Sequence, residues 1–182
     1  MDEKKAKEYQ KFTVNAKGEE LYEKKSFKDL IDSQRCIIIV EGFYEWMHVG
    51  AGKNLVKYPF YIAPKDEEFF FIAGIWNEWK NFTTKQSSLS SVIITSEANP
   101  LMAKIHNSKK RMPLMFHSSQ VNNWLSRSLT REEVTSMIRP YDENRIKAHS
   151  ITKKFNHFQK ETTNIPEISD YVDYPELQML IN

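Results

Sequence analysis

The stretch RCIIIVEGFYEW, residues 35–46, decides which kind of fold this chain can form. Its first half is a run of apolar and β-branched residues of strand length, and such a run predicts a buried β-strand. Gly42 interrupts the run, so the strand is expected to break there. Two carboxylates, Glu41 and Glu45, lie on either side of this glycine. Because a carboxylate among aromatic residues is costly to bury, the stretch raises a question of function as well as of fold.

The composition limits the classes of protein to which the chain can belong. Its 182 residues, of which 40% are hydrophobic, are enough for one domain with a core, so a single domain over residues 1–182 is expected. The net charge of +2 gives no strong overall attraction to nucleic acid, and an anion site would have to be a local patch. Neither a signal peptide nor an apolar run of transmembrane length is present, which predicts a cytoplasmic protein.

Several kinds of site are not predicted. The one cysteine, Cys36, excludes an internal disulfide, and its place in an apolar run predicts an inert core thiol rather than a nucleophile. The sequence has no glycine-rich phosphate loop, no HExxH and no CxxC motif. Its five histidines lack the spacing of metal ligands. We therefore expect neither a cofactor nor a metal ion.

Apolar runs on both sides of residues 35–46 predict the rest of a sheet. Gly50 and Gly52 predict a hairpin turn, whereas the polar residues 81–91 are expected to form a loop. The core strands are expected over residues 36–46, 57–63, 69–76 and 91–96, with another within 146–156.

Capping residues predict short helices between and after these strands. Pro100 suits the first position of a helix after Asn99, and Thr130 with Glu133 has the pattern of a capping box. Further helices are expected over residues 2–11, over 27–34 after Ser26, and after Ser118 or Ser119. Non-local strands with short helices predict an α+β fold with a curled, mostly antiparallel, barrel-like core flanked by helices.

Glu45 and His106 have the surroundings that favour acid–base chemistry. With the two-residue period of a strand, Glu45 shares a face with an aromatic residue, and such a setting raises the pKa of a carboxylate. His106 precedes the cations Lys109, Lys110 and Arg111, which suits a proton shuttle beside an anion. Simpler explanations remain: Glu45 as a strand-end carboxylate in water, and His106 as a residue that interacts with a helix dipole.

Seven short motifs follow one another along the chain. They are NAKGE (15–19), RC (35–36), GFYEW (42–46), AGIW (73–76), TSEAN (95–99), IH (105–106) and RMP (111–113). This succession resembles the SRAP family, the SOS-response-associated peptidase-like proteins. The resemblance covers about residues 2–156.

The resemblance implies a sensor of abasic sites in single-stranded DNA that acts in the DNA-damage (SOS) response. In the family, a cysteine exposed by removal of the initiator Met captures the ring-opened sugar as a thiazolidine, a covalent DNA–protein crosslink. By resemblance Glu45 moves the protons, His106 acts on the sugar, and Asn15 orients the cysteine or the sugar. The residues expected to bind DNA are Lys17, Trp76, Thr95, Lys109, Lys110 and Arg111.

The chain departs from the family pattern in three places. It begins with Met-Asp instead of Met-Cys-Gly-Arg, which predicts an N-terminally truncated form or a variant without the nucleophile. Lys17 replaces an arginine and keeps the charge but loses the two-pronged phosphate contact. Three extra residues, SKK (108–110), lengthen the loop before the RMP motif and add cations that can contact a DNA backbone.

Two other functions stay open. One is a binding module for single-stranded DNA that does not crosslink, because the cysteine is missing. The other is a peptidase that releases its own N-terminal residue or propeptide, although no Ser-His-Asp or Cys-His pattern of a general peptidase is visible. The expected partner is single-stranded DNA with abasic sites and not a membrane. The protein is expected to be a monomer that associates with the nucleoid when it binds DNA.

Overall fold

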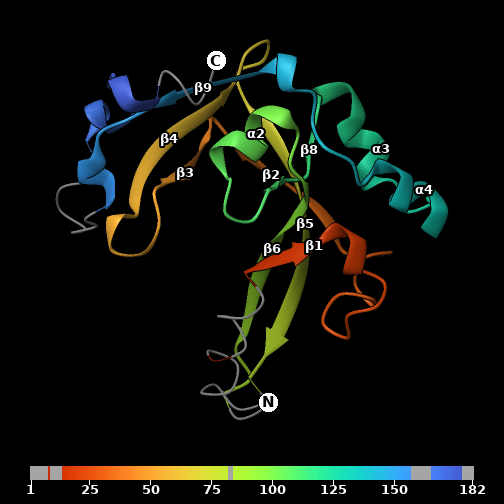
Figure 1. Ribbon diagram of the computed structural model, residues 1–182. Coiled ribbons are helices and arrows are strands. Elements are labelled where there is room, and N and C mark those ends of the chain that lie inside the picture. Colours follow the sequence, from red (N-terminus) through yellow and green to blue (C-terminus); the bar gives the residue numbers. More distant parts are fainter. Residues whose placement is uncertain (1–7, 9–13, 82–83, 157–164, 178–182) are drawn as a thin grey trace. The chain divides into compact units, whose positions relative to one another are not determined.

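The computed structural model describes residue 8 and residues 14–81, 84–156 and 165–177 (Figure 1). The chain forms two compact units, and each unit is built from three separate segments of the sequence. The first comprises Met1–Ile39, Phe71–Ser96 and Pro113–Tyr141, and the second comprises Val40–Phe70, Glu97–Met112 and Asp142–Asn182. The single domain expected over residues 1–182 stays a prediction. The helix expected over residues 2–11 lies almost wholly outside the described residues.

The first unit is built on a mostly antiparallel sheet. Its strands are β1 (Asn15–Lys17), β2 (Arg35–Val40), β5 (Phe70–Lys80), β6 (Ser87–Glu97) and β8 (Met115–Phe116). The order is β1-β6-β5-β2, with β8 beside β5, and the short β7 (Arg111–Pro113) pairs with β6. β5 and β6 are antiparallel, whereas β1 runs parallel to β6. A Cβ at Gly74 would lie 2.9 Å from the Val92 carbonyl oxygen, so the close approach of β5 and β6 requires glycine there.

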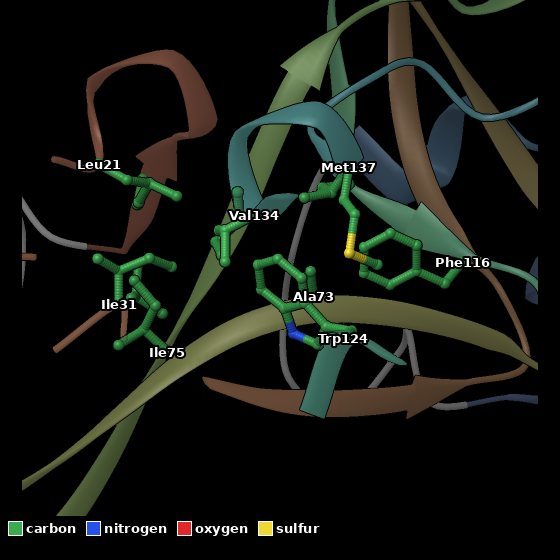
Figure 2. Packing of buried hydrophobic residues seen from close by; sticks show 12 residues of the cluster. Leu21, Ile31, Ala73, Ile75, Phe116, Trp124, Val134 and Met137 are labelled. Atoms are coloured by element: carbon green, nitrogen blue, oxygen red, sulfur yellow. The ribbon is translucent and has the colours of Figure 1, made fainter. Parts of the chain in front are cut away.

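The core of the first unit contains residues of this sheet and of two of the four short helices described in this unit. The helices are η1 (Gly18–Glu20), η3 (Ser118–Gln120), α3 (Val121–Leu125) and α4 (Arg131–Met137). Figure 2 shows Trp124 of α3 among the apolar side chains of β5, β8 and α4. Trp124 is fully buried and its ring centroid lies 5.2 Å from that of Phe116. Full burial of one such large side chain contributes about 1.5–3 kcal/mol.

Arg35 is a charged residue enclosed by the first unit. Its guanidinium donates hydrogen bonds to the carbonyl oxygens of Trp124 (2.8 Å), Ile31 (2.7 Å) and Ser126. The Trp124 indole nitrogen in turn donates to the Cys36 carbonyl oxygen at 3.1 Å. Desolvation lowers the pKa of the guanidinium, and the ring of three carbonyl oxygens stabilises its charge. The arginine of the RC motif therefore fastens α3 to β2.

The second unit contains a three-stranded antiparallel sheet in the order β3-β4-β9. Its strands are β3 (Phe43–Val49), β4 (Val56–Pro64) and β9 (Ile146–Ser150). β3 and β4 form the predicted hairpin (Figure 1), and its turn, which includes η2 (Gly52–Asn54), uses positive φ angles at Gly50 (83°) and Gly52 (58°). Within this sheet β3 pairs on one side only, so its other edge can receive hydrogen bonds from side chains.

A short helix, α2 (Pro100–Ile105), packs against β3. Asn99 caps it by accepting a hydrogen bond from the Met102 N–H at 2.8 Å, and Pro100 occupies the first turn as predicted. Glu143, at the start of η4 (Glu143–Arg145), accepts a further hydrogen bond from the Leu101 N–H at 2.9 Å. These contacts fix the helix that carries His106 at its C-terminal end.

Residues 165–177 pack against the sheet of the second unit. The Val172 N–H donates to the Ser150 carbonyl oxygen at 2.9 Å, and the Ser150 hydroxyl donates back to the Val172 carbonyl oxygen at 2.6 Å. Ile168 of η6 (Pro166–Ser169) joins an apolar cluster with Ile151 and with Phe155 of η5 (Lys153–Asn156). This segment is therefore part of the second unit's structure.

Glu176 connects the same segment to β4 and η5. It accepts a hydrogen bond from the Tyr58 hydroxyl at 2.7 Å, which raises the pKa of Tyr58 to about 12. The Lys153 ammonium lies 3.6 Å from Glu176 and 3.9 Å and 4.6 Å from the ring centroids of Tyr58 and Tyr174. Lys153 is thus held by one carboxylate and two aromatic rings.

The predicted fold class is confirmed, because short helices accompany mostly antiparallel sheets. Neither strand order closes on itself, so the core is not a closed barrel. Residues 35–46 break at Gly42 as predicted, but β2 and β3 are half-buried rather than buried, and Ile39 is exposed. Both strands end the order of their sheet, which explains the exposure. No helix within the described ranges is long and apolar enough to cross a membrane.

Three local predictions are wrong. β6 begins at Ser87, inside the expected loop 81–91. Its exposed serines give no apolar strand pattern, but pairing with β5 satisfies the hydrogen bonds of its backbone. Residues 21–33 form consecutive turns instead of a helix over 27–34, and the Lys24 carbonyl oxygen accepts from the N–H groups of residues 27 and 28. His117, rather than Ser118 or Ser119, caps the turn that leads into α3.

Candidate active site

Glu45 and His106 meet in the second unit. Glu45 lies in β3, where Phe60 of β4 is its cross-strand neighbour, and His106 is the residue at which α2 ends. The packing of α2 on β3 brings His106 Nδ1 to 3.5 Å from Glu45 Oε1. The side chains of His106 and Glu45 are 18% and 23% exposed, so both are largely withdrawn from water and still accessible. Their adjacency is what a shared acid–base role requires.

Burial dominates the electrostatics of Glu45. Loss of water around the carboxylate raises its pKa, while His106, a hydrogen bond with the Trp46 backbone and the charge of Lys109 each lower it by less. The net direction is upward, so Glu45 keeps a proton at higher pH than an ordinary glutamate does. A carboxyl group whose pKa is raised in this way is suited to both accepting and returning a proton.

The hydrogen bonds of His106 determine which ring nitrogen is available for chemistry. Nδ1 lies 2.8 Å from the Arg111 carbonyl oxygen, which can only accept, so Nδ1 carries a proton and donates it there. In the neutral ring Nε2 then has a free lone pair and can take a proton. The backbone of Arg111 thus orients the imidazole and fixes its tautomer.

A cavity of about 730 Å³ in the second unit includes this pair. It is lined by residues of the β3–β4 hairpin, of the loop after α2, and of η5. These residues are Glu45, Trp46, His48, Leu55, Val56, Lys57, His106, Ser108, Lys109, Lys153 and Phe155. Among them three lysines and two histidines face a single carboxylate, which favours an anionic ligand, and the aromatic and aliphatic residues provide apolar walls.

The basic run that follows His106 divides into three environments. Lys109 lines the cavity. Lys110 is exposed, has a φ of 51°, and accepts a hydrogen bond from the Ala98 N–H at its carbonyl oxygen (3.0 Å). Arg111 is half-buried in β7 and contributes its carbonyl oxygen to His106. Of the three residues, Lys109 is therefore the one that lines the cavity together with Glu45 and His106.

Asn15, Lys17 and Thr95 lie in the first unit. Lys17 of β1 is the parallel-strand partner of Thr95 in β6, and the Thr95 hydroxyl donates to the Ala16 carbonyl oxygen at 3.4 Å. Lys17 forms an exposed ion pair with Glu20, with 3.0 Å between Nζ and Oε1. Asn15 begins the same strand and is exposed.

Trp76 occupies another part of the first unit. It is 37% exposed in β5 and lines a small cavity of about 140 Å³ together with Arg35 and Arg127. An accessible indole ring is what base stacking requires, so the structure is compatible with the stacking role that the sequence predicts.

Cys36 is half-buried in β2, and burial raises the pKa of its thiol, which reduces the reactive thiolate form. In the part of the chain that the structure describes, no three side chains of His, Cys, Asp or Glu are grouped so that they could hold a metal ion.

Sequence analysis missed Lys57, Lys153 and His48 as parts of the site. The position of Lys57 could have been predicted from the hairpin turn at Gly50 and Gly52. The turn sets the register of the two strands, and this register places Lys57 opposite His48. No local pattern marks Lys153, whose position depends on Tyr58 and on the C-terminal segment.

The profile of the family described as SOS response associated peptidase (SRAP) matches residues 2–158. This chain belongs to the SRAP family. The SRAP chain is 31% identical over 156 residues to abasic site processing protein YoqW of Bacillus subtilis, covering 85% of this chain and 65% of that protein. It is 26% identical over 171 residues to abasic site processing protein HMCES of Gallus gallus, covering 82% of this chain and 48% of that protein. The chain thus spans less than two thirds of each of these relatives.

Solved structures share the fold of the SRAP chain. The crystal structure of a protein from Bacteroides thetaiotaomicron superposes with a TM-score of 0.86 at 34% identity, over 94% of this chain and 71% of that one. A protein from Bordetella bronchiseptica superposes with a TM-score of 0.65 at 22% identity, over 76% and 64% of the two chains, which shows a common fold and no more.

Proposed function

We propose that this SRAP chain is an abasic-site sensor of the DNA-damage response that binds single-stranded DNA. When an N-terminal cysteine is present, it forms a covalent crosslink with the lesion. The observation that supports this function is the Glu45–His106 pair inside a lysine-lined cavity. The names of the relatives, abasic site processing proteins, point to the same substrate class.

The covalent chemistry needs an amine, a thiol and two proton carriers. The α-amine of a terminal cysteine condenses with the aldehyde of the ring-opened sugar and releases water. The thiol then adds across the resulting C=N bond and closes a thiazolidine ring, with no change in oxidation state. Glu45 gives a proton to the departing hydroxyl and takes one from the attacking thiol, which its raised pKa suits. His106 exchanges a proton with the sugar hydroxyl through Nε2 during ring opening.

The lysines of the cavity bind the DNA backbone in this proposal. Lys109 lies in the loop after α2, and Lys57 and Lys153 lie on β4 and η5. Phosphates replace counterions around such ammonium groups, so affinity falls steeply as salt rises. Trp46 is half-buried, lines the same cavity and offers an aromatic face to a base. The DNA-binding roles of Lys17, Trp76, Thr95, Lys110 and Arg111, and the orienting role of Asn15 towards the cysteine or the sugar, remain part of the proposal.

The test compares two proteins. One is the 182-residue chain itself, and the other is the same chain preceded by a segment whose first residue, after removal of the initiator Met, is cysteine. Each is mixed with single-stranded DNA that carries one abasic site and is run on a denaturing gel after heating. We expect a heat-stable adduct from the cysteine-bearing protein only, because a lysine or the α-amine of Met1 forms at best a reversible imine. Cys36→Ala should leave the adduct unchanged.

Other outcomes would identify a different function. A stable adduct from the printed chain that Cys36→Ala abolishes would move the nucleophile to β2. Salt-sensitive binding without any adduct from the cysteine-bearing protein would favour the plain DNA-binding module. If mass spectrometry detected loss of the N-terminal residue in the absence of DNA, the self-processing peptidase would be favoured.

A further inference from the structure

The open edge of β3 is occupied by a side chain next to His106. The amide of Asn107 forms two hydrogen bonds with the main chain of His48. Its Oδ1 accepts from the His48 N–H at 3.0 Å, and its Nδ2 donates to the His48 carbonyl oxygen at 2.8 Å. A neighbouring antiparallel strand would make the same pair of hydrogen bonds with both groups of one residue. Asn107 therefore takes the place of a strand at this point of the edge.

The position of this contact relates it to the Glu45–His106 pair. His48 follows Glu45 by three residues in β3, and Asn107 follows His106 directly. The same strand contributes the Trp46 backbone hydrogen bond to the Glu45 carboxylate. The chain after α2 is therefore tied to β3 close to the two side chains that have to stay within reach of each other.

The loop beyond Asn107 is folded back on α2 and brings Lys109 to the cavity. The His106 carbonyl oxygen accepts from the Lys110 N–H at 2.8 Å and from the Lys109 N–H at 3.4 Å. Lys110 adopts a positive φ to complete this turn. The loop is thus anchored at its start by Asn107 and at its end by the Lys110 carbonyl oxygen, which receives the Ala98 N–H.

We infer that Asn107 is a positioning residue, which holds the loop after α2 on the edge of β3 and thereby sets the geometry between His106 and Glu45. Its two hydrogen bonds are exposed, so they add little to global stability. Their value lies in alignment, because a displacement of about 1 Å in an acid–base pair can lower a rate by up to 10²-fold. The kinetic consequence rests on the proposed crosslinking function, whereas the geometric consequence does not.

The geometric arm is a double-mutant cycle on the pKa of Glu45, measured by carboxyl-carbon NMR in the protein without DNA. His106→Gln removes the imidazole and should raise the pKa of Glu45, since His106 lowers it in the intact pair. In the Asn107→Ala background that rise should fall to less than half. Asn144→Ala is the matched control, because Asn144 is an exposed asparagine of the same unit whose amide group donates a hydrogen bond to the neighbouring Asp142 carboxylate.

The kinetic arm uses the cysteine-bearing protein under single-turnover conditions. Asn107→Ala should lower the maximal crosslinking rate on the order of 10-fold and leave the DNA concentration for half-maximal rate within about twofold. Asn107→Gln, which keeps the amide, should recover part of the rate. If no protein crosslinks, the proposed function fails and the NMR cycle still decides the role of Asn107. If His106→Gln raised the pKa of Glu45 as much in the Asn107→Ala background as in the parent chain, the inference would be overturned.

Discussion

Arg35 in the first unit and Glu45 in the second are both charged side chains among apolar residues, but their surroundings differ. Arg35 is buried and its guanidinium has three carbonyl acceptors, so its charge is matched by fixed dipoles. Glu45 is 23% exposed and its desolvation outweighs the help from His106, Trp46 and Lys109. Desolvation shifts both pKa values, but fixed main-chain dipoles surround the Arg35 guanidinium on three sides, so breaking these contacts destabilises the fold. Glu45 has fewer partners and stays accessible, so its shifted pKa suits it to proton transfer.

The largest expected effect tests the structural half of this comparison. Arg35→Met should lower the free energy of unfolding by about 3 kcal/mol or more, because it leaves the carbonyl oxygens of Ile31, Trp124 and Ser126 without their donor. Urea unfolding measures this loss of stability, provided that the slope of unfolding free energy against urea concentration is the same in both proteins. Arg127→Met, at an exposed arginine that lines the same small cavity, should stay within about 0.5 kcal/mol of the parent chain. Equal urea midpoints for Arg35→Met and Arg127→Met would show that Arg35 is no more important for stability than an exposed arginine.

The chemical half predicts the next effect. In the cysteine-bearing protein, Glu45→Ala should slow crosslinking to an abasic site by roughly 10²-fold, the usual scale for loss of one acid–base group. His106→Ala should impair ring opening and reversal of the same adduct. Gel quantification over time gives both rates, and Glu41→Ala serves as control because Glu41 is exposed at the break before β3. Similar rates for the Glu41 and Glu45 variants would return Glu45 to the role of an ordinary strand-end carboxylate.

The pH dependence of stability sharpens the contrast further. Since burial raises the pKa of Glu45, the folded state prefers its protonated form, and stability is lost as pH rises through that pKa. Glu45→Gln should therefore melt at a higher temperature than the parent chain at pH 7. The difference should disappear towards pH 4, where an unfolded glutamate is protonated as well. A lower melting temperature for Glu45→Gln at pH 7 would contradict the direction of the pKa shift.

The smallest expected effect concerns the lysines. Removal of Lys109 and Lys110 together should flatten the dependence of single-stranded DNA affinity on salt, by about 0.7 in the logarithmic slope for each phosphate contact that is lost. Because Lys109 lines the cavity and Lys110 does not, the single variant Lys109→Ala should account for most of the change. Fluorescence anisotropy at several salt concentrations measures it. An unchanged slope in the double variant would assign both residues to an ordinary solvated loop.

The features that could be predicted from the sequence are those with a local cause. The glycines of the β3–β4 turn, the Asn99–Pro100 start of α2, and the Thr130–Glu133 capping box all act within a few residues, and each was expected correctly. Glu45 and His106 were noticed because each stands out against its neighbours in the chain, but the local pattern left simpler explanations open and it was the resemblance to the SRAP family that assigned them roles. Their roles still rest on the proposed chemistry.

The missed features depend on contacts between distant segments. The serines at the start of β6 give no strand pattern, and it is β5 that makes them a strand. Arg35 appeared as a motif residue without a purpose, because its acceptors lie up to 91 positions away in the chain. Asn107 has no local signal either, since its amide recognises the backbone of His48.

The C-terminal segment has a consequence for where this chain can be cut. The family match ends at residue 158, whereas Ile168, Val172 and Glu176 form contacts with η5, β9 and β4. A recombinant fragment that stopped at the end of the match would keep every family motif. It would nevertheless uncover the ring of Tyr58 and leave the Lys153 ammonium without its carboxylate. The length that has to be expressed for a well-packed protein is therefore greater than the length over which its relatives can be recognised.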